Sequence, residues 1–456
     1  MSAPASGRTE PGAALELAER VPRLAEAEGA SEAEVLVATG DEALTRFANS
    51  EIHQNVAERD VRINLRFVRG KRIGVASSGR TDDDALRRLV ENAGRIAAVA
   101  DETPDWAGLP GALPIEPVAG AHAAGTAEAS PELRADGVRA VIDAADRAGV
   151  TAFGSFATGV EIVAIATTQG IRAAESRTSA RLLVVTMGPD DGTGYADAAS
   201  VDATRIDAAA LGREAAEKAR RSARPVDLPP GEYPVVLEEY AVADLLDNLG
   251  YTGFSGLAVE EGRSFFETGK RIGSDLVTLV DDARDPSGMP ASFDYEGVPT
   301  RRVVMVEAGV CREIVHDAAT AARAGVASTG HGLPAPNPWG PFPLHAAMAA
   351  GSTPRAAVVA GLRDGLVVTR FHYTNVVHAK LAVITGMTRD GTFLVRNGKV
   401  VGPVRNLRFT QSYLDALAGV EAVSAERRLL RGELGAVLVP AVRIGSWRFT
   451  GATSAH

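Results

Sequence analysis

The chain has 456 residues, 45% of them hydrophobic and 23% charged, so it is long enough for two or three domains with ample cores. Its net charge of -10, with no Lys/Arg cluster among aromatic residues, argues against a nucleic-acid partner. A single cysteine excludes an intrachain disulfide framework, and no apolar run approaches the ~20 residues of a membrane helix. The first residues, MSAPASGRTEPG, lack the pattern of a secretory signal. We therefore expect a soluble cytoplasmic protein that contacts no membrane.

The first half of the sequence predicts helices separated by groups of strands. Residues 1–12 are rich in small residues and proline, which predicts a disordered tail. We expect a helix over 13–29, then four short strands at 33–39, 43–48, 61–68 and 72–78. Thr81 and the three aspartates after it predict a helix that runs to about Ala100. A long loop follows at 102–130, then a helix at 131–149, strands within 151–187, and a helix at about 203–223 capped by Asp202.

Four prolines within residues 223–234 predict a domain boundary, which divides the chain into an N-terminal domain (13–226) and a C-terminal domain (227–456). The second half alternates strand-like runs with Gly and Pro turns, and Asn397-Gly398 predicts a two-residue hairpin turn. Residues 330–343 form a long Pro/Gly loop of the kind that is often functional. We expect an α+β fold. It has an N-terminal mixed domain with a small sheet and long helices, and an antiparallel β-rich C-terminal domain.

Residues 235–256, VVLEEYAVADLLDNLGYTGFSG, predict a strand followed by an amphipathic helix. Val242, Leu245, Leu246 and Leu249 follow the spacing i, i+3, i+4, i+7, which places them on one core-facing stripe. Glycine-rich sequence from Gly250 onward predicts the end of the helix.

Two segments of the second half resemble the TldD/PmbA (TldD/TldE) family of metallopeptidases and their partner subunits. The first is LVDDARDPSGMPASFDYEGVPTRRVVMVEAGV (279–310), which contains Asp294, Glu296, Gly297 and Pro299, and the second is NGKVVGPVRNLRFTQS (397–412). The resemblance covers roughly 30–450. It implies an α+β fold and dimers that enclose a cleft for an extended polypeptide.

In the family's catalytic subunit, the helix that corresponds to 239–252 carries a His-Glu-x-x-x-His zinc motif. Here Asp247 stands at the first His, Asn248 at the Glu and Thr252 at the second His. Zinc-dependent hydrolysis needs a set of zinc ligands and a base that takes a proton from the bound water. This degenerate motif provides neither the ligand set nor the base. The family's further Cys ligand near the C-terminus is also missing, because the one cysteine is Cys311. The resemblance therefore points to the TldE/PmbA-type branch, with no metal in this chain and zinc expected in a TldD-type partner.

Several side chains are candidates for a pocket around the degenerate motif: Glu239, Tyr251, His331, His345, His372 and His378. Because their spacing matches no metal-ligand pattern, ordinary hydrogen-bonding roles are favoured for the histidines. Cys311 is better explained as a buried thiol than as a nucleophile with His316, since five residues along a strand place them on opposite faces. The acidic run from Asp281 to Asp285 is better explained as a solvated turn than as a cation site.

The leading hypothesis is a TldE/PmbA-like subunit of a TldD/TldE-type peptidase complex, paired with a TldD-type paralogue or with itself, that forms part of a chamber for an extended peptide. The alternative is a stand-alone hydrolase with a re-purposed site. It would cut an amide or peptide bond in a peptide or in a lincosamide-like natural-product intermediate. A pure binding protein is a third class, and the acidic chain gives no support for direct DNA contact.

Overall fold

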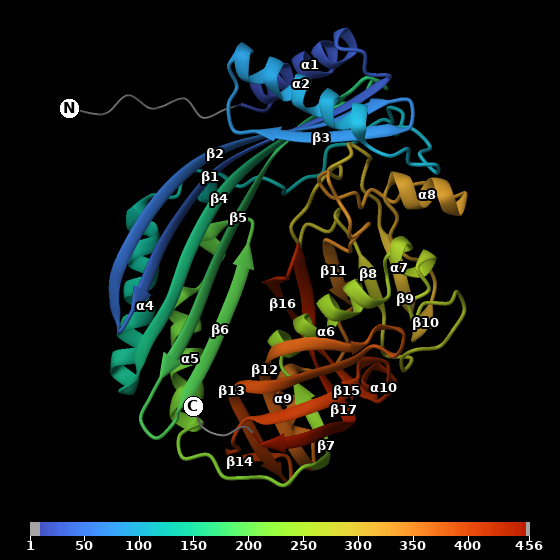
Figure 1. Ribbon diagram of the computed structural model, residues 1–456. Coiled ribbons are helices and arrows are strands. Elements are labelled where there is room, and N and C mark those ends of the chain that lie inside the picture. The colour runs from blue at the N-terminus through green and yellow to red at the C-terminus, as the bar shows by residue number, and fades with distance from the viewer. Residues whose placement is uncertain (1–9, 453–456) are drawn as a thin grey trace, which may run out of the picture.

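The computed structural model describes residues 10–452, and within them the chain forms two β-sheets with helices packed against them (Figure 1). The disordered tail predicted for 1–12 falls mostly outside the described residues. It is wrong for Pro11 and Gly12, which open helix α1 (Pro11–Ala27), because proline is well suited to the first turn of a helix. None of the helices in the described part of the chain is both long and apolar enough to cross a bilayer.

The first sheet is antiparallel throughout and has the strand order β3-β2-β1-β4-β5-β6. Its strands are β1 (Glu32–Ala48), β2 (Glu51–Arg69), β3 (Arg72–Ser78), β4 (Thr151–Thr167), β5 (Arg172–Met187) and β6 (Thr193–Ser200). The two short strands predicted at 33–39 and 43–48 are wrong, because β1 continues unbroken through Gly40-Asp41. Pairing with β2 on one side and β4 on the other keeps this stretch extended.

One face of this sheet carries all its helices. Helices α1 and α2 (Asp83–Val99) cover one end, and α4 (Pro131–Ala148) and α5 (Ala208–Arg221) cover the other. The helix α3 (Ala124–Ala127) precedes α4. The helix predicted at 203–223 is divided, because Asp202 caps a 3-10 turn, η1 (Ala203–Arg205), while Asp207 caps α5 separately. The opposite face is left for the C-terminal half, which lies beside the long curved strands (Figure 1).

The second sheet is built from the C-terminal half, and most of its pairings are antiparallel. The strand β7 pairs with both β12 and β17, so β7, β12, β13, β15 and β17 close a circuit. The strands are β7 (Gly231–Leu237), β8 (Leu279–Asp281), β9 (Val303–Glu307), β10 (Val310–Cys311), β11 (His345–Met348), β12 (Asp364–His378), β13 (Val383–Arg396), β14 (Lys399–Pro403), β15 (Leu407–Ser412), β16 (Val420–Arg431) and β17 (Ala436–Ala452). The predicted Asn397-Gly398 turn joins β13 to β14.

Helix α6 (Glu239–Thr252) packs into the main core of the C-terminal half. The predicted stripe is confirmed, since Val242, Leu245, Leu246 and Leu249 are each at most 4% exposed and lie in that core. The helix extends two residues beyond the predicted end at Gly250. The other C-terminal helices are short: α7 (Gly256–Glu260), α8 (Ala318–Ala324), α9 (Arg355–Ala360), η2 (Ala379–Leu381) and α10 (Tyr413–Ala418). The chain thus has the predicted α+β fold, with its β-rich part in the C-terminal half.

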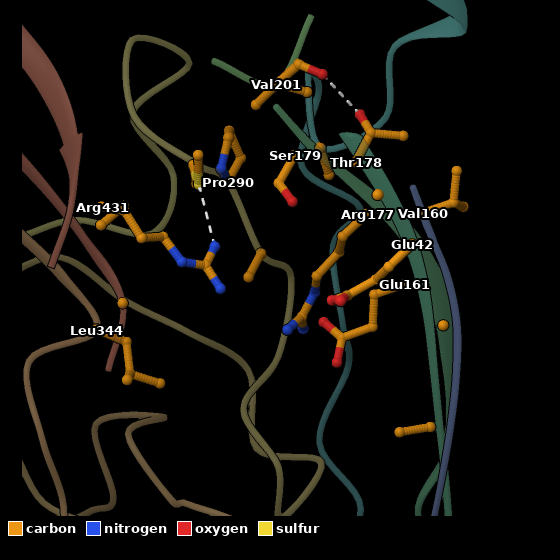
Figure 2. Close-up of a pocket in the computed structure, with 18 of the residues that line it drawn as sticks. Glu42, Val160, Glu161, Arg177, Thr178, Ser179, Val201, Pro290, Leu344 and Arg431 are labelled. Atoms are coloured by element: carbon orange, nitrogen blue, oxygen red, sulfur yellow. Dashed lines mark hydrogen bonds between the residues drawn. The ribbon is translucent and has the colours of Figure 1, made fainter. Parts of the chain in front are cut away.

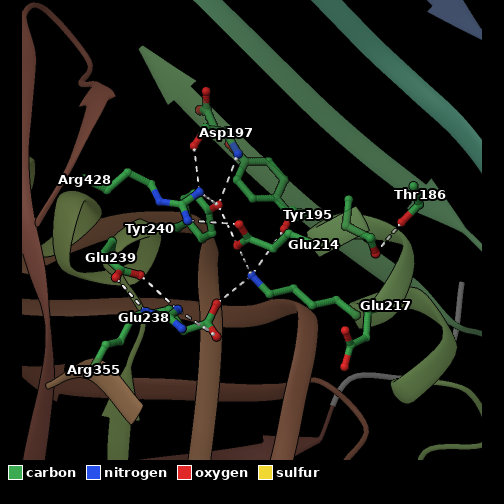
Figure 3. A network of polar contacts seen from close by, with 12 residues as sticks. Thr186, Tyr195, Asp197, Glu214, Glu217, Glu238, Glu239, Tyr240, Arg355 and Arg428 are labelled. Atoms are coloured by element: carbon green, nitrogen blue, oxygen red, sulfur yellow. Dashed lines mark hydrogen bonds and ion pairs between the residues drawn. The ribbon is translucent and has the colours of Figure 1, made fainter. Parts of the chain in front are cut away.

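A network of charged side chains joins α5 of the first sheet's layer to the start of α6 (Figure 3). Lys218 Nζ lies 2.8 Å from Glu214 Oε1 and 2.7 Å from Glu238 Oε2. Arg428 Nη2 on β16 donates to Glu214 Oε2 at 2.9 Å, and the Tyr240 hydroxyl donates to Glu214 Oε1 at 2.9 Å. Because its members come from both halves of the chain, this network fixes the position of α6 relative to the first sheet.

Candidate functional site

A cleft of about 510 Å³ lies between the helix-free face of the first sheet and the loops of the C-terminal half. Figure 2 shows Arg431 extending from the C-terminal side toward the sheet, where Arg177, Glu161 and Glu42 lie close together. A second hollow of about 350 Å³ continues the cleft toward the Pro-rich loop. Both hollows are lined by Ala38, Arg62, Glu161, Tyr295, Leu344 and Leu434, so we describe them as one cleft.

Strand register places a row of charged side chains across the floor of the cleft. Asp60 pairs with Gly40, Gly40 with Glu161, and Glu161 with Arg177, so the four residues form one row on one face of the sheet. A Cβ atom on Gly40 would meet nothing within 4 Å, so the row has an open notch at its centre. A ligand group can therefore approach the sheet between two carboxylates.

The next row of the floor brings two like charges together. Glu42 and Glu58 are directly opposite each other on β1 and β2. Such a pair destabilises a sheet when no cation lies between the two carboxylates. The floor is therefore suited to a ligand that brings positive charge or hydrogen-bond donors.

Arg177 is fixed in place by contacts with both halves of the chain. Its Nε donates to Glu175 Oε1 at 2.5 Å, and its Nη2 donates to the Phe293 carbonyl at 2.7 Å. The guanidinium also lies over the rings of Phe293 and Tyr295, at 5.5 and 5.7 Å from their centroids. Burial alone would lower the pKa of Arg177, but Glu175 and its other neighbours raise it above the ordinary value. It remains a fixed positive charge on the floor of the cleft.

Two of the predicted histidines meet at a buried aspartate beside the cleft. His331 Nε2 lies 2.8 Å from Asp281 Oδ1, and the backbone N–H of His345 donates to Asp281 Oδ2 at 2.7 Å. The prediction of a solvated turn is wrong for Asp281, which is fully buried as the partner of these two residues. Burial lowers the pKa of His345 to about 4, so its imidazole, which lines the cleft, is neutral at pH 7.

The α6 positions that the resemblance assigns to the degenerate motif, Asp247, Asn248 and Thr252, lie behind the cleft wall. Asp247 Oδ2 accepts from the Glu433 backbone N–H at 3.1 Å, and the next residues, Leu434 and Gly435, line the cleft. Asn248 Nδ2 donates to the Asp244 carbonyl one turn back at 2.9 Å. These hydrogen bonds keep the motif's polar groups within α6 and the adjoining turn.

Comparison with known proteins identifies the family of this chain. Its residues 33–97, 125–223 and 230–451 match the models of PmbA/TldA metallopeptidase domain 1, central domain and C-terminal domain. The chain belongs to the PmbA/TldD metallopeptidase family. It is 25% identical over 209 residues to a metalloprotease TldD homolog of Buchnera aphidicola, covering 44% of this chain and 42% of that protein.

A metalloprotease of Methanothermobacter thermautotrophicus is 26% identical over 238 residues, which is 51% of each chain. The chain thus spans about half the length of the curated relatives it matches. The crystal structure of TldE from Thermococcus kodakarensis superposes with a TM-score of 0.87 at 19% identity, covering 95% of this chain and 99% of that one. This structural similarity shows that the two proteins share a fold.

The motif positions of this PmbA/TldD family member do not fit a catalytic zinc ion. Thr252 is fully buried, and its hydroxyl donates to the Asn248 carbonyl at 2.7 Å, so it is committed to the helix backbone. The Asn248 amide can neither take a proton from water nor replace a histidine nitrogen. Only Asp247 offers a zinc-binding oxygen. Within residues 10–452, no group of three His, Cys, Asp or Glu side chains is arranged to hold a metal ion.

The remaining predicted pocket residues lie elsewhere, and of the six only His345 lines the cleft. Glu239 is held by Arg355 through bonds of 2.7 and 3.1 Å, which removes it as a base. Tyr251 is 44% exposed and packs against Trp339 of the Pro-rich loop. His372 and His378 lie on β12, where His378 Nδ1 caps η2. The structure therefore does not gather these residues into one pocket, because each is engaged by its own local element.

Sequence reasoning missed the charged residues that line the cleft: Glu42, Glu58, Asp60, Arg62, Glu161, Arg177 and Arg431. They lie on strands that are distant in the sequence and come together only through strand register. Alternation along each strand was a usable signal. On β1, Glu42 has the parity opposite to helix-facing Val35 and Val37, and on β2, Glu58 and Asp60 have the parity opposite to helix-facing Ile63 and Leu65.

Proposed function

We propose that this chain is a TldE-type subunit of a TldD/TldE-type peptidase complex. It contributes the charged cleft between its two sheets to a chamber that receives an extended peptide. The TldD-type partner supplies the zinc ion and the cleavage chemistry. The complex is the heterodimer with a TldD-type paralogue.

The observation that carries this proposal is the state of the motif on α6. Asn248 and Thr252 each donate a side-chain hydrogen bond to the backbone of α6. The side chains at two of the three motif positions are therefore held by the helix rather than free to bind zinc or activate water. The fold shared with the Thermococcus kodakarensis TldE supports the same assignment. The cleft remains open beside this helix, and its floor has the notch at Gly40 that an extended chain can enter.

A mixing experiment tests the proposal. The chain, a TldD-type paralogue and their mixture are assayed for hydrolysis of an unfolded peptide. We expect strong, chelator-sensitive hydrolysis from the mixture and none from this chain alone. Equal activity of the paralogue with and without this chain would contradict a subunit role.

Variants of this chain sharpen the assay. Gly40→Leu fills the notch in the cleft and should weaken peptide capture by the mixture about tenfold, because a side chain then occupies the space of the peptide. Gly402→Leu is the matched control, since Gly402 also lies on a strand and has open space around it but lies outside the cleft. If both variants behave like the wild type, the cleft is not the peptide site.

One observation favours a second candidate, a stand-alone hydrolase that uses the acidic pair on α6. Burial raises the pKa of Asp247 to about 7 and that of Asp244 to about 6, values that suit acid–base chemistry near neutral pH. Metal-independent amide hydrolysis by the lone chain that Asp247→Asn abolishes would support this candidate. Unchanged hydrolysis in that variant would reject it.

A further inference from the structure

A separate hollow, distinct from both parts of the cleft, lies on the opposite face of the first sheet. It has a volume of about 600 Å³ and lies between β1, β2 and β4 on one side and the segment from Thr126 to Arg134 on the other. The small side chains of Ala43 and Ala57 face each other on neighbouring strands there, which leaves the hollow room. A hollow of this size is large enough for a small metabolite.

Arg134 is the unusual residue of this hollow. It lies in the first turn of α4, is 2% exposed, and has no carboxylate partner within the described part of the chain. Its Nη1 donates to Thr158 Oγ1 at 3.0 Å and, at 3.4 Å, to the Ala129 carbonyl. Its Nε is buried without any hydrogen-bond partner. Among the described residues, its hydrogen-bond acceptors are two neutral oxygens, both bound by Nη1, so the guanidinium can still donate to a further acceptor.

A buried arginine without a counter-charge is energetically unfavourable. Burial of an unpaired charge is unfavourable, and proteins normally offset that cost with a counter-charge and a full set of hydrogen bonds. Burial lowers the pKa of Arg134, yet a guanidinium keeps its proton in a protein. The charge of Glu132, exposed on the same helix, acts on the pKa of Arg134 in the opposite direction, but the two side chains form no ion pair among the described residues. The guanidinium therefore has room for an oxyanion from outside the chain.

The other charged residues around the hollow do not supply a counter-charge for Arg134. Arg59 and Asp41 border the hollow and neutralise each other through two hydrogen bonds of 2.5 and 2.9 Å. Glu42 and Glu58 also border it, but side chains alternate along a strand, and these two line the cleft on the opposite face. Arg134 is thus the one uncompensated charge deep in the hollow among the residues described.

We propose that this hollow binds a small molecule through a carboxylate or phosphate group held by the guanidinium of Arg134, with the hydroxyl of Thr158 beside it. Arginine's planar fork matches both oxyanions and can contact two oxygens at once. The site is separate from the peptide cleft and does not depend on the proposed subunit role. The ligand would lie behind the strands whose other face forms the floor of the cleft.

The test is binding of simple oxyanions to the full chain. Inorganic phosphate and acetate are titrated separately at constant ionic strength held with sodium chloride, and binding is followed by calorimetry and by the shift in the chain's own melting temperature. We expect saturable binding of at least one anion, and the anion that binds identifies the ligand class. Arg134→Gln should weaken it about tenfold or more, because a charge-assisted pair is lost.

Two further variants make the result decisive. Arg139→Gln lies on the same helix but is exposed and paired with Asp136, so it should leave anion binding unchanged. Arg134→Lys keeps the charge without the fork and should retain weakened binding even if Arg134→Gln fails to fold. The proposal is overturned if neither anion binds the wild type saturably, or if binding is the same in Arg134→Gln or Arg134→Lys as in the wild type.

Discussion

Replacing Glu214 by glutamine tests the charged network that joins α5 to α6 (Figure 3). The side chain is 23% exposed and receives hydrogen bonds from Lys218, Arg428 and Tyr240 at 2.8 to 2.9 Å. Glutamine keeps the volume of the side chain but removes the negative charge between two cations. The substitution therefore isolates the electrostatic contribution of this carboxylate to the free energy of unfolding.

The size of the effect follows from the pKa of Glu214. Burial alone would raise this pKa, but Lys218 and Arg428 outweigh burial and lower it from 4.5 to about 2. At about 1.4 kcal/mol per pH unit, ionised Glu214 stabilises the folded state by about 3 kcal/mol. Because the folded-state pKa is depressed, this contribution is complete well above pH 4.5 and declines as the pH falls toward 2. About half of it should remain at pH 3.

Urea unfolding followed by intrinsic fluorescence at pH 7 and pH 3 measures the effect. Glu214→Gln should lose about 3 kcal/mol at pH 7 and about half of that at pH 3. Glu217→Gln is the matched control, because Glu217 is 70% exposed on the same helix and pairs with Arg221 at 3.7 Å, so its loss should stay below about 0.5 kcal/mol. Equal losses in the two variants, or a Glu214→Gln loss that does not change with pH, would refute the reasoning.

Four further substitutions have expected outcomes. Burial raises the pKa of Glu296 to about 8, so the folded chain holds a proton there that the unfolded chain releases above pH 4.5, and Glu296→Gln should reduce the fall in melting temperature between pH 6 and 8. Trp447→Ala should cost about 3–5 kcal/mol in urea unfolding, because the ring is fully buried, whereas Trp339→Ala, at 61% exposed, should cost about 0.5 kcal/mol. Tyr413→Phe removes a 3.0 Å donor from the buried Asp244 carboxyl and should cost about 1–3 kcal/mol, with a larger loss at pH 8 than at pH 5. A loss that is the same at both pH values would show that Asp244 does not titrate in this range.

Helix α6 shows what the sequence can predict well. Its apolar spacing, its acidic start and the glycines after it are local signals, so its type, its buried face and its approximate ends follow from the residues themselves. The same holds for α2, whose Asp82 accepts a hydrogen bond from the Ala85 backbone N–H as expected of an N-cap. The family resemblance adds the position of the degenerate motif on α6.

The cleft shows where prediction from the sequence ends. Gly40-Asp41 resembles a turn locally, but pairing on both sides holds it within β1, and only this register brings Gly40 between Asp60 and Glu161. Asp281 looks like part of a solvated acidic turn because its partners, His331 and His345, are about 50 to 64 residues away. Contacts of this kind depend on tertiary structure, so residue spacing along the chain does not reveal them.

The most direct test of the central claim is the zinc content and peptidase activity of the chain purified alone. The chain is saturated with zinc, freed of loosely bound metal, and analysed by elemental mass spectrometry before the peptide assay. We predict far less than one zinc ion per chain and no chelator-sensitive hydrolysis, because Asn248 and Thr252 are committed to the backbone of α6. One tightly bound zinc ion per chain with robust, chelator-sensitive cleavage would contradict the account.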